Sequence, residues 1–150
     1  MTERVDFYVL KSTAIKQRWM FACRLAEKAF LRDFRVVIAN DTLADAQAID
    51  DLLWTFNERS FVPHQIYQAS GPTDAVTKVH LVVEPAAPAS ADLLVNLTAQ
   101  VPTHWERHAR IAEIIDADEE RRRLGRERFK TYRDLQIELQ THQLGETDHG

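Results

Sequence analysis

The most reactive side chains of this sequence are its histidines and its one cysteine. His104 and His108 lie four residues apart, about one helical turn, and two imidazoles at that spacing can share a metal ion. A zinc-protease helix also needs a glutamate directly after the first histidine, where this chain has Trp105, and no third ligand is indicated. The sequence therefore predicts a solvent-facing histidine pair and no metal site.

Neither the cysteine nor the remaining histidines form a catalytic set. Cys23 has no activating neighbour and lies among apolar positions, so we expect a buried thiol in a reducing compartment. His64 follows Pro63 in an extended segment and could act as a base, but a single histidine is more often structural or interfacial. A small α/β enzyme that uses His64, or the pair His104 and His108, stays open as an alternative.

The glycines argue against a nucleotide site. A loop that cradles phosphate needs glycines so that backbone amides can approach the ligand. The glycines of this chain are Gly71, Gly125, Gly145 and Gly150, and none follows an early strand. We therefore expect no cofactor.

The elements that position these residues alternate between strand and helix. Runs of β-branched and aliphatic residues predict strands at residues 5–10, 34–39, 79–83, 93–97 and 110–115. Helical spacing predicts helices at residues 15–30, from a cap at Asp41 or Thr42 to Trp54, and through the arginine-rich segment 121–133. This alternation favours an α/β fold with a mostly parallel sheet covered on both faces.

Length and composition set the broad class. The chain has 150 residues with 45% hydrophobic content, which suits one domain. We place this domain at residues 1–140 and a flexible tail at 141–150. No apolar run approaches the roughly 20 residues that span a membrane, and the N-terminus lacks the order of a signal peptide. We expect a soluble cytoplasmic protein that does not bind a membrane.

Positive charge is concentrated in the segment 121–133, although the net charge of the chain is −4. Four basic residues fall on one helical stripe because they are spaced by four, four and three residues: Arg122, Arg126, Lys130 and Arg133. Phe129 adds a ring beside them, and Ile115 ends the preceding strand. This mixture suits an acidic peptide that ends in an apolar residue.

Two other interpretations of the stripe stay open. One is a solvated surface helix in which glutamates compensate the arginines. The other is direct binding of single-stranded nucleic acid, which needs basic residues along a groove and aromatic rings that stack on bases. The acidic remainder of the surface disfavours the second interpretation.

A second patch gathers apolar residues around a proline. Trp54 continues the apolar side of its helix, and after a polar loop come Phe61, Val62, Pro63 and His64. Loops run over the surface, so some of these rings should be exposed. Exposed aromatic residues favour a protein interface, while core packing explains Trp54 equally well.

The sequence, both patches included, resembles the chi subunit of bacterial DNA polymerase III, an accessory protein of the clamp loader. The resemblance extends over most of the chain and is carried by residues 6–10, 53–64, 93–97 and 126–133. Chi proteins have a three-layer, Rossmann-like α/β fold that lacks a nucleotide-binding loop. The resemblance therefore implies a non-catalytic adaptor in DNA replication.

The resemblance also implies a partner for each patch. The residues that match the site for the acidic C-terminal tail of single-stranded DNA-binding protein are Arg126, Phe129, Lys130, Arg122 and Ile115. The residues that match the psi-subunit interface are Trp54, Phe61, Val62, Pro63 and His64, a surface that a helicase could share. Nucleic acid would be reached only indirectly, within the nucleoid-associated replication machinery.

Overall fold

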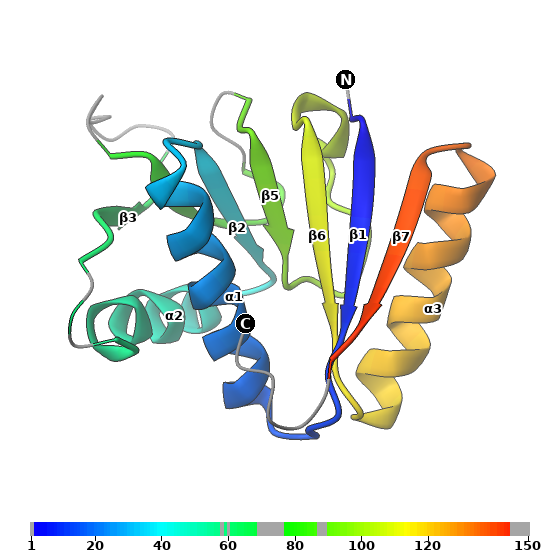
Figure 1. Cartoon of the computed structure of the whole chain (residues 1–150), viewed down its shortest axis with the longest axis horizontal. Helices are drawn as coiled ribbons and strands as arrows, with labels where there is room; N and C mark the ends of the chain where they lie inside the picture. The colour runs from blue at the N-terminus through cyan, green and yellow to red at the C-terminus, as the bar shows by residue number, and fades with distance from the viewer. Residues whose placement is uncertain (1, 58, 60, 69–76, 87–89, 145–150) are drawn as a thin grey trace.

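Seven strands form one all-parallel sheet in the order β3-β4-β2-β5-β6-β1-β7 (Figure 1). The structure is a computed structural model that describes residues 2–57, 59, 61–68, 77–86 and 90–144. The strands are β1 Arg4–Val9, β2 Val36–Asn40, β3 His64–Ile66, β4 Val79–Val83, β5 Leu93–Asn96, β6 Arg110–Ile115 and β7 Glu138–Gln143. The helices are α1 Ile15–Leu31, α2 Leu43–Thr55, the 3₁₀ turn η1 Trp105–Arg107 and α3 Glu119–Asp134.

The helices cover both faces of the sheet and so form three layers. Strand residues alternate between two cores, as in β2, where Val36 and Ile38 contribute to one core and Val37 and Ala39 to the other. The first core is completed by α1 and α2, and the second contains Tyr132 of α3. The predicted Rossmann-like, three-layer α/β fold is confirmed, and the sheet is parallel throughout the described strands.

Most predicted elements are confirmed, but the two edge strands were not foreseen. β3 has three residues, and β7 is largely polar, so neither carries the apolar pattern by which a strand is recognised. β7 pairs with β1 through its backbone, and it includes residues 141–143. The expectation of a flexible tail from Thr141 is therefore wrong for these three residues. Residues 145–150 of that tail lie outside the described residues, as do Gly71, Gly145 and Gly150.

A buried polar network fixes α3 against the sheet. Glu113 of β6 accepts hydrogen bonds from Arg128 Nε at 2.9 Å, from the Tyr132 hydroxyl at 2.8 Å and from Asn96 Nδ2 at 2.8 Å. All four side chains are buried. Burial, and then the Glu113 carboxylate, raises the pKa of Tyr132 far above its ordinary value, so its hydroxyl remains a donor. The network sets where the outer side of α3 lies.

We expect Glu113→Ala to lower the free energy of unfolding by about 3–5 kcal/mol, because it leaves the Arg128 guanidinium buried without its carboxylate. Urea denaturation followed by circular dichroism measures this change. Arg123→Ala is the matched control, since this exposed arginine of the same helix pairs with Glu120 and Glu127 at the surface. Its unfolding midpoint should stay close to wild type. A similar loss of stability in both variants would contradict the role of the buried pair.

Candidate functional site

Helix α3 begins at Glu119 after the capping residue Asp118, which lies three residues beyond the end of β6. The Asp118 carboxylate accepts a hydrogen bond from the backbone N–H of Arg121 at 3.0 Å, and Glu119 and Glu120 place negative charge in the first turn. Arg121 in turn donates to buried Asp116 at 2.7 Å, which ties the start of α3 to the end of β6. The position of the helix is therefore set at both its first turn and its middle.

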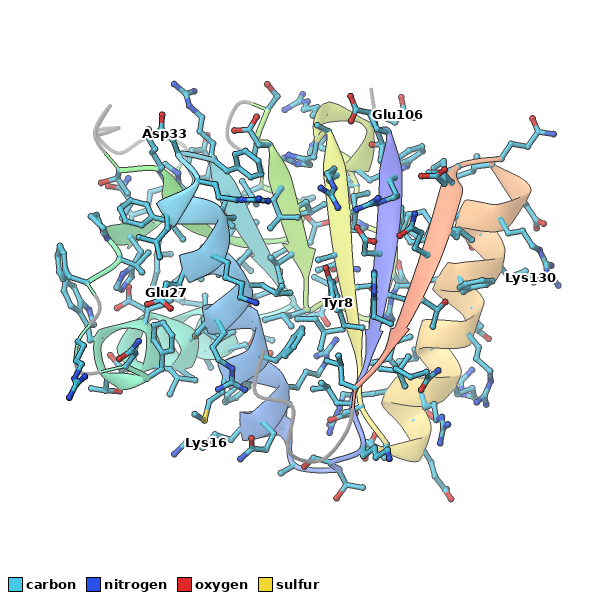
Figure 2. The ribbon with its side chains drawn as sticks, in the orientation of Figure 1. Tyr8, Lys16, Glu27, Asp33, Glu106 and Lys130 are labelled. Carbon is cyan, nitrogen blue, oxygen red and sulfur yellow. The ribbon has the colours of Figure 1, made fainter. Side chains whose placement is uncertain are left out.

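The outer side of α3 carries three exposed basic residues that form no ion pair with any described residue. Arg122, Arg126 and Lys130 are exposed, and Lys130 projects from the helix into solvent (Figure 2). Among the described residues none of the three lies within 4.0 Å of a carboxylate, whereas the neighbouring Arg123 has two acidic partners. Glutamates therefore neutralise the charge of Arg123. The charges of Arg122, Arg126 and Lys130 are available for a ligand.

Two apolar residues lie beside this stripe, partly withdrawn into the core. Phe129 is half-buried, and its ring meets Phe7 edge-on with centroids 5.1 Å apart. Ile115 ends β6 and is almost fully buried beneath Gly125. Arg122, Gly125 and Phe129 are spaced by three and four residues, so they share one side of the helix. The structure thus brings Phe129 next to the stripe and places Ile115 below it.

A shallow depression runs along the exposed surface of α3. It is lined by Arg122 and Arg126 together with Glu119, Glu120 and Arg123. Phe129 and Ile115 do not line it, so an apolar group and a carboxylate of the same ligand would contact different sides of Arg126. The predicted residues form a basic surface with an adjoining apolar edge.

The aromatic patch has an exposed part and a buried part. Trp54 is 53% exposed and Phe61 is 64% exposed, and their ring centroids lie 5.4 Å apart. Core packing is therefore not the reason for Trp54. Pro63 is half-buried beside them, and Val62 lies in the core. Trp54 and Phe61 are the residues that offer apolar surface to a partner.

His64 supports this patch from below. Its side chain is inaccessible, and its ring lies 4.7 Å from that of Trp54. One ring nitrogen bonds with the Val62 carbonyl at 2.7 Å, and the other contacts the Asp50 carbonyl at 3.1 Å and the Asp50 carboxylate at 3.2 Å. These contacts fix the end of α2 against the segment that follows it. A histidine whose side chain is enclosed and whose two ring nitrogens both contact oxygen atoms of the neighbouring chain acts as a positioning group.

The other reactive side chains do not form a site within the part of the chain that the structure describes. His104 and His108 flank the turn η1, and His108 is buried with Nδ1 accepting from the Ala91 N–H at 3.1 Å. Burial lowers the pKa of His108. The expectation of a solvent-facing pair is therefore wrong for His108, because the segment forms a short turn packed against the sheet. Cys23 is a core thiol as expected, and burial raises its pKa to about 12.

The described part of the chain contains neither a candidate metal site nor a helix that could span a membrane. No group of three or more histidine, cysteine, aspartate or glutamate residues there could hold a metal ion. None of the described helices is both long enough and apolar enough to cross a bilayer. The chemically distinctive features are thus the two surfaces on α2 and α3.

The fold and these surfaces define the chain as a Rossmann-like α/β domain that carries a basic stripe on α3 and an exposed aromatic pair at the end of α2. The sequence model of one family, described as "DNA polymerase III chi subunit, HolC", matches residues 1–140, and the chain belongs to that family. It is a subunit of the DNA polymerase III holoenzyme without catalytic activity of its own, and it has an accessory role in DNA replication. Its partners lie within the replication complex.

Three relatives carry the name DNA polymerase III subunit chi. The chain is 34% identical to that of Pseudomonas aeruginosa, covering 94% of this chain and 96% of the relative. It is 26% identical to that of Haemophilus influenzae, covering 97% and 100%, and 24% identical to that of Escherichia coli, covering 93% and 97%. Among solved structures it resembles Mss116p DEAD-box helicase domain 2 bound to an RNA duplex, with a TM-score of 0.57 and 10% identity. The match covers 96% of this chain and 65% of that one, and it shows the fold alone.

We expect Gly125→Ala to destabilise the protein by about 1 kcal/mol, because the added methyl group overpacks the junction of α3 and β6. A Cβ at this position would lie 2.5 Å from Ile115 Cδ1 and 2.8 Å from Ile115 Cγ1. In an open helix the same change stabilises by about 1 kcal/mol. Thermal unfolding measures the sign, with Thr131→Ala at an exposed position of α3 as control. If both variants raise the unfolding temperature, α3 does not approach β6 as closely as described.

Proposed function

We propose that the chain is a non-catalytic adaptor that connects the psi subunit of the clamp loader to the acidic C-terminal tail of single-stranded DNA-binding protein. The observation that carries the proposal is the unpaired stripe of Arg122, Arg126 and Lys130 beside Phe129. Exposed cations without partners are an electrostatic match for an acidic peptide. The half-buried ring next to them suits the apolar residue at the end of such a tail.

In this proposal the acidic tail lies along the outer side of α3. Arg126, at the middle of the stripe, pairs with the terminal carboxylate through its two parallel donors, while Arg122 and Lys130 attract the acidic residues. Phe129 gives the terminal ring an apolar contact that its neighbour Phe7 holds in place. Ile115 acts from beneath Gly125, where it supports the floor of the site. Such exposed contacts weaken with salt.

The psi subunit is proposed to bind the aromatic pair of Trp54 and Phe61. Two large rings in mutual contact and open to solvent supply the buried apolar centre that protein interfaces need. Pro63 borders the pair, and Val62 and His64 hold the backbone that presents it. A helicase that uses the same surface would compete with psi.

The arrangement of the two surfaces supports a bridging role. α2 and β3 lie at one end of the sheet, and α3 covers strands at the other end (Figure 1). Partners on these surfaces would not overlap, so psi and the tail could be bound at once. Many tails on one coated strand would raise occupancy through effective concentration. We further propose that the protein works in the cytoplasm at the nucleoid-associated replication machinery.

Direct binding of single-stranded nucleic acid is the second candidate, and the position of Phe129 disfavours it. An aromatic residue that stacks on bases needs a free ring face. Phe129 is half-buried against Phe7, and no other aromatic residue shares the outer stripe of α3. A histidine enzyme is disfavoured because His64 and His108 are both buried and hydrogen-bonded.

We expect Arg126→Ala to weaken binding of the acidic tail peptide by at least about tenfold, since it removes a charge-assisted hydrogen bond. Fluorescence anisotropy of a labelled peptide measures the dissociation constant, and added salt should weaken wild-type binding. Lys16→Ala is the control, because this exposed lysine of α1 lies away from α3 and its loss changes net charge equally (Figure 2). Equal weakening by both variants, or tight binding of a naked oligonucleotide by Arg126→Ala, would argue against the proposal.

We expect Phe61→Ala to abolish co-purification with the psi subunit while leaving the tail peptide affinity unchanged. The loss of one ring of the exposed pair removes apolar contact area at the centre of the proposed interface. Leu31→Ala is the matched control, because Leu31 is also apolar and is 73% exposed, at the end of α1. Retention of psi by Phe61→Ala would move the psi interface elsewhere on the molecule.

A further inference from the structure

The carboxyl ends of β2 and β5 form a point at which the chain departs in opposite directions. The two strands are neighbours in the sheet. After β2 the chain leads through α2 to β3 at one edge, and after β5 it leads through η1 to β6 on the other side. In parallel α/β sheets the crevice outside such a point is where small ligands bind.

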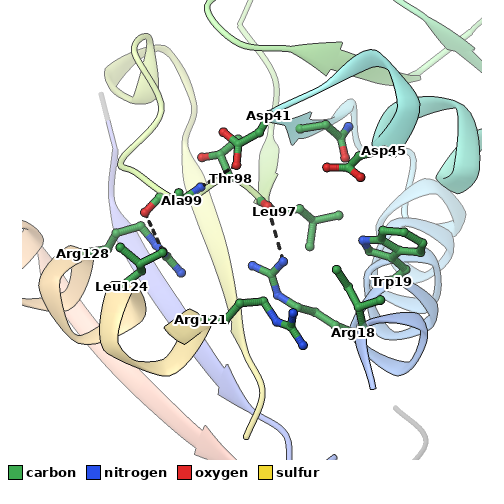
Figure 3. A pocket seen from close by; sticks show the side chains of 12 residues that line it. Arg18, Trp19, Asp41, Asp45, Leu97, Thr98, Ala99, Arg121, Leu124 and Arg128 are labelled. Atoms are coloured by element: carbon green, nitrogen blue, oxygen red, sulfur yellow. Dashed lines mark hydrogen bonds between the residues drawn. The ribbon is translucent and has the colours of Figure 1, made fainter. Parts of the chain in front are cut away.

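A cavity of about 230 Å³ lies at this point (Figure 3). Its floor is formed by the residues that end or follow the two strands, including Asn40 and Leu97. Its walls come from the first turns of α1, α2 and α3, which contribute Arg18, Asp45 and Arg121. The cavity lies on the side of α3 that faces α1, and none of the residues proposed for the tail lines it.

Arg18 brings a buried positive charge to the cavity and has no direct ion-pair partner among the described residues. The residue is 4% exposed, and its Nε and Nη1 donate to the carbonyls of Ile114 at 2.9 Å and Leu97 at 3.4 Å. Among the residues that the structure describes, no carboxylate oxygen lies within 4.0 Å of it. By contrast, Arg121 pairs with Asp116 at 2.7 Å and Arg128 pairs with Glu113 at 2.9 Å.

Keeping this charge buried costs free energy, so a partner for it is expected. Burial, and then the neighbouring Arg128, lowers the pKa of Arg18 to about 10, while Glu113 and Asp116 act in the opposite direction, and the side chain is still a cation at neutral pH. The two carbonyl contacts anchor the side chain but carry no net charge, and the nearby carboxylates of Glu113 and Asp116 are already paired with Arg128 and Arg121. An oxyanion in the cavity would pair with Arg18 directly.

The opposite wall presents hydrogen-bond acceptors. Figure 3 shows Asp41 and Asp45 across the cavity from Arg18 and Arg121. Asn40 is buried, its Nδ2 donates to two backbone carbonyls, and its Oδ1 has no partner among the described residues. A ligand that satisfies both walls has an anionic end and an end with hydroxyl or amino donors.

We propose that this cavity binds a small oxyanion that also carries hydroxyl or amino groups, as a nucleoside monophosphate does. Arg18 holds the oxyanion, and Asp41, Asp45 and Asn40 accept hydrogen bonds from the other end. No glycine-rich loop is present to supply backbone amides, so side chains hold the ligand and binding is weak. The site goes beyond the adaptor role and does not depend on it.

The test is a titration of the full ¹⁵N-labelled chain with AMP, followed by NMR, with sodium chloride of equal ionic strength as reference. Saturable shifts are expected at the amides of Asp41, Thr98 and Ala99. Arg18→Met should reduce the affinity at least about tenfold, since it removes a charge-assisted contact, and Lys16→Met, in the same helix turn, should not change it. Shifts spread over the outer arginines of α3, or none at all, overturn the proposal.

A second arm uses inorganic phosphate, which has the oxyanion but lacks the amino end. AMP should bind severalfold more tightly, and equal affinity overturns the part assigned to the acidic wall. If Arg18→Met does not give a folded spectrum, Asp45→Asn decides the question, because this residue lies in the first turn of α2 and is partly exposed. The Asp45→Asn variant should bind inorganic phosphate more tightly than wild type does. The ratio between the affinities for AMP and for inorganic phosphate should become smaller. Unchanged affinities for both ligands overturn the proposal.

Discussion

The position of α3 depends on one buried carboxylate, Glu113, which meets the Arg128 guanidinium, the Tyr132 hydroxyl and the Asn96 amide in the interior. Its three partners come from a strand and from two successive turns of the helix, so the helix cannot slide or rotate without leaving a buried charge unpaired. Gly125 allows the close approach that these contacts need, because any side chain there would meet Ile115. The buried contacts of Glu113 on the inner side of α3 therefore also fix the position of the basic stripe on its outer side.

The same helix thus divides its arginines by function. Arg121 and Arg128 point inward and are paired with buried acids, Arg123 is paired at the surface, and Arg126 is exposed with no acidic partner in the part of the chain that the structure describes. Only the last kind has charge left for a ligand. Arg18 is the interior counterpart, because it is buried and no carboxylate among the described residues pairs with it directly, and this is the observation on which the proposed oxyanion site rests.

The fold class and most elements could be predicted because buried strands and amphipathic helices carry apolar periodicity. β7 could not, since its polar edge is held through the backbone of β1. The stripe on α3 was visible because it follows helical spacing, and so was the aromatic patch. The sequence did not indicate which members are exposed: Val62 and His64 are enclosed, whereas Phe61 in the same segment is exposed. The cavity at Arg18 joins residues far apart in the sequence, so no local pattern indicates it.

A bridging role requires that the two proposed partners bind at opposite ends of one sheet. The most direct test is to titrate the acidic tail peptide by isothermal calorimetry into the chain alone and into the chain saturated with the psi subunit. We expect the same affinity and one-to-one stoichiometry in both cases, because the two surfaces share no residues. Displacement of either partner by the other would show that they compete for one surface and would contradict a bridging role.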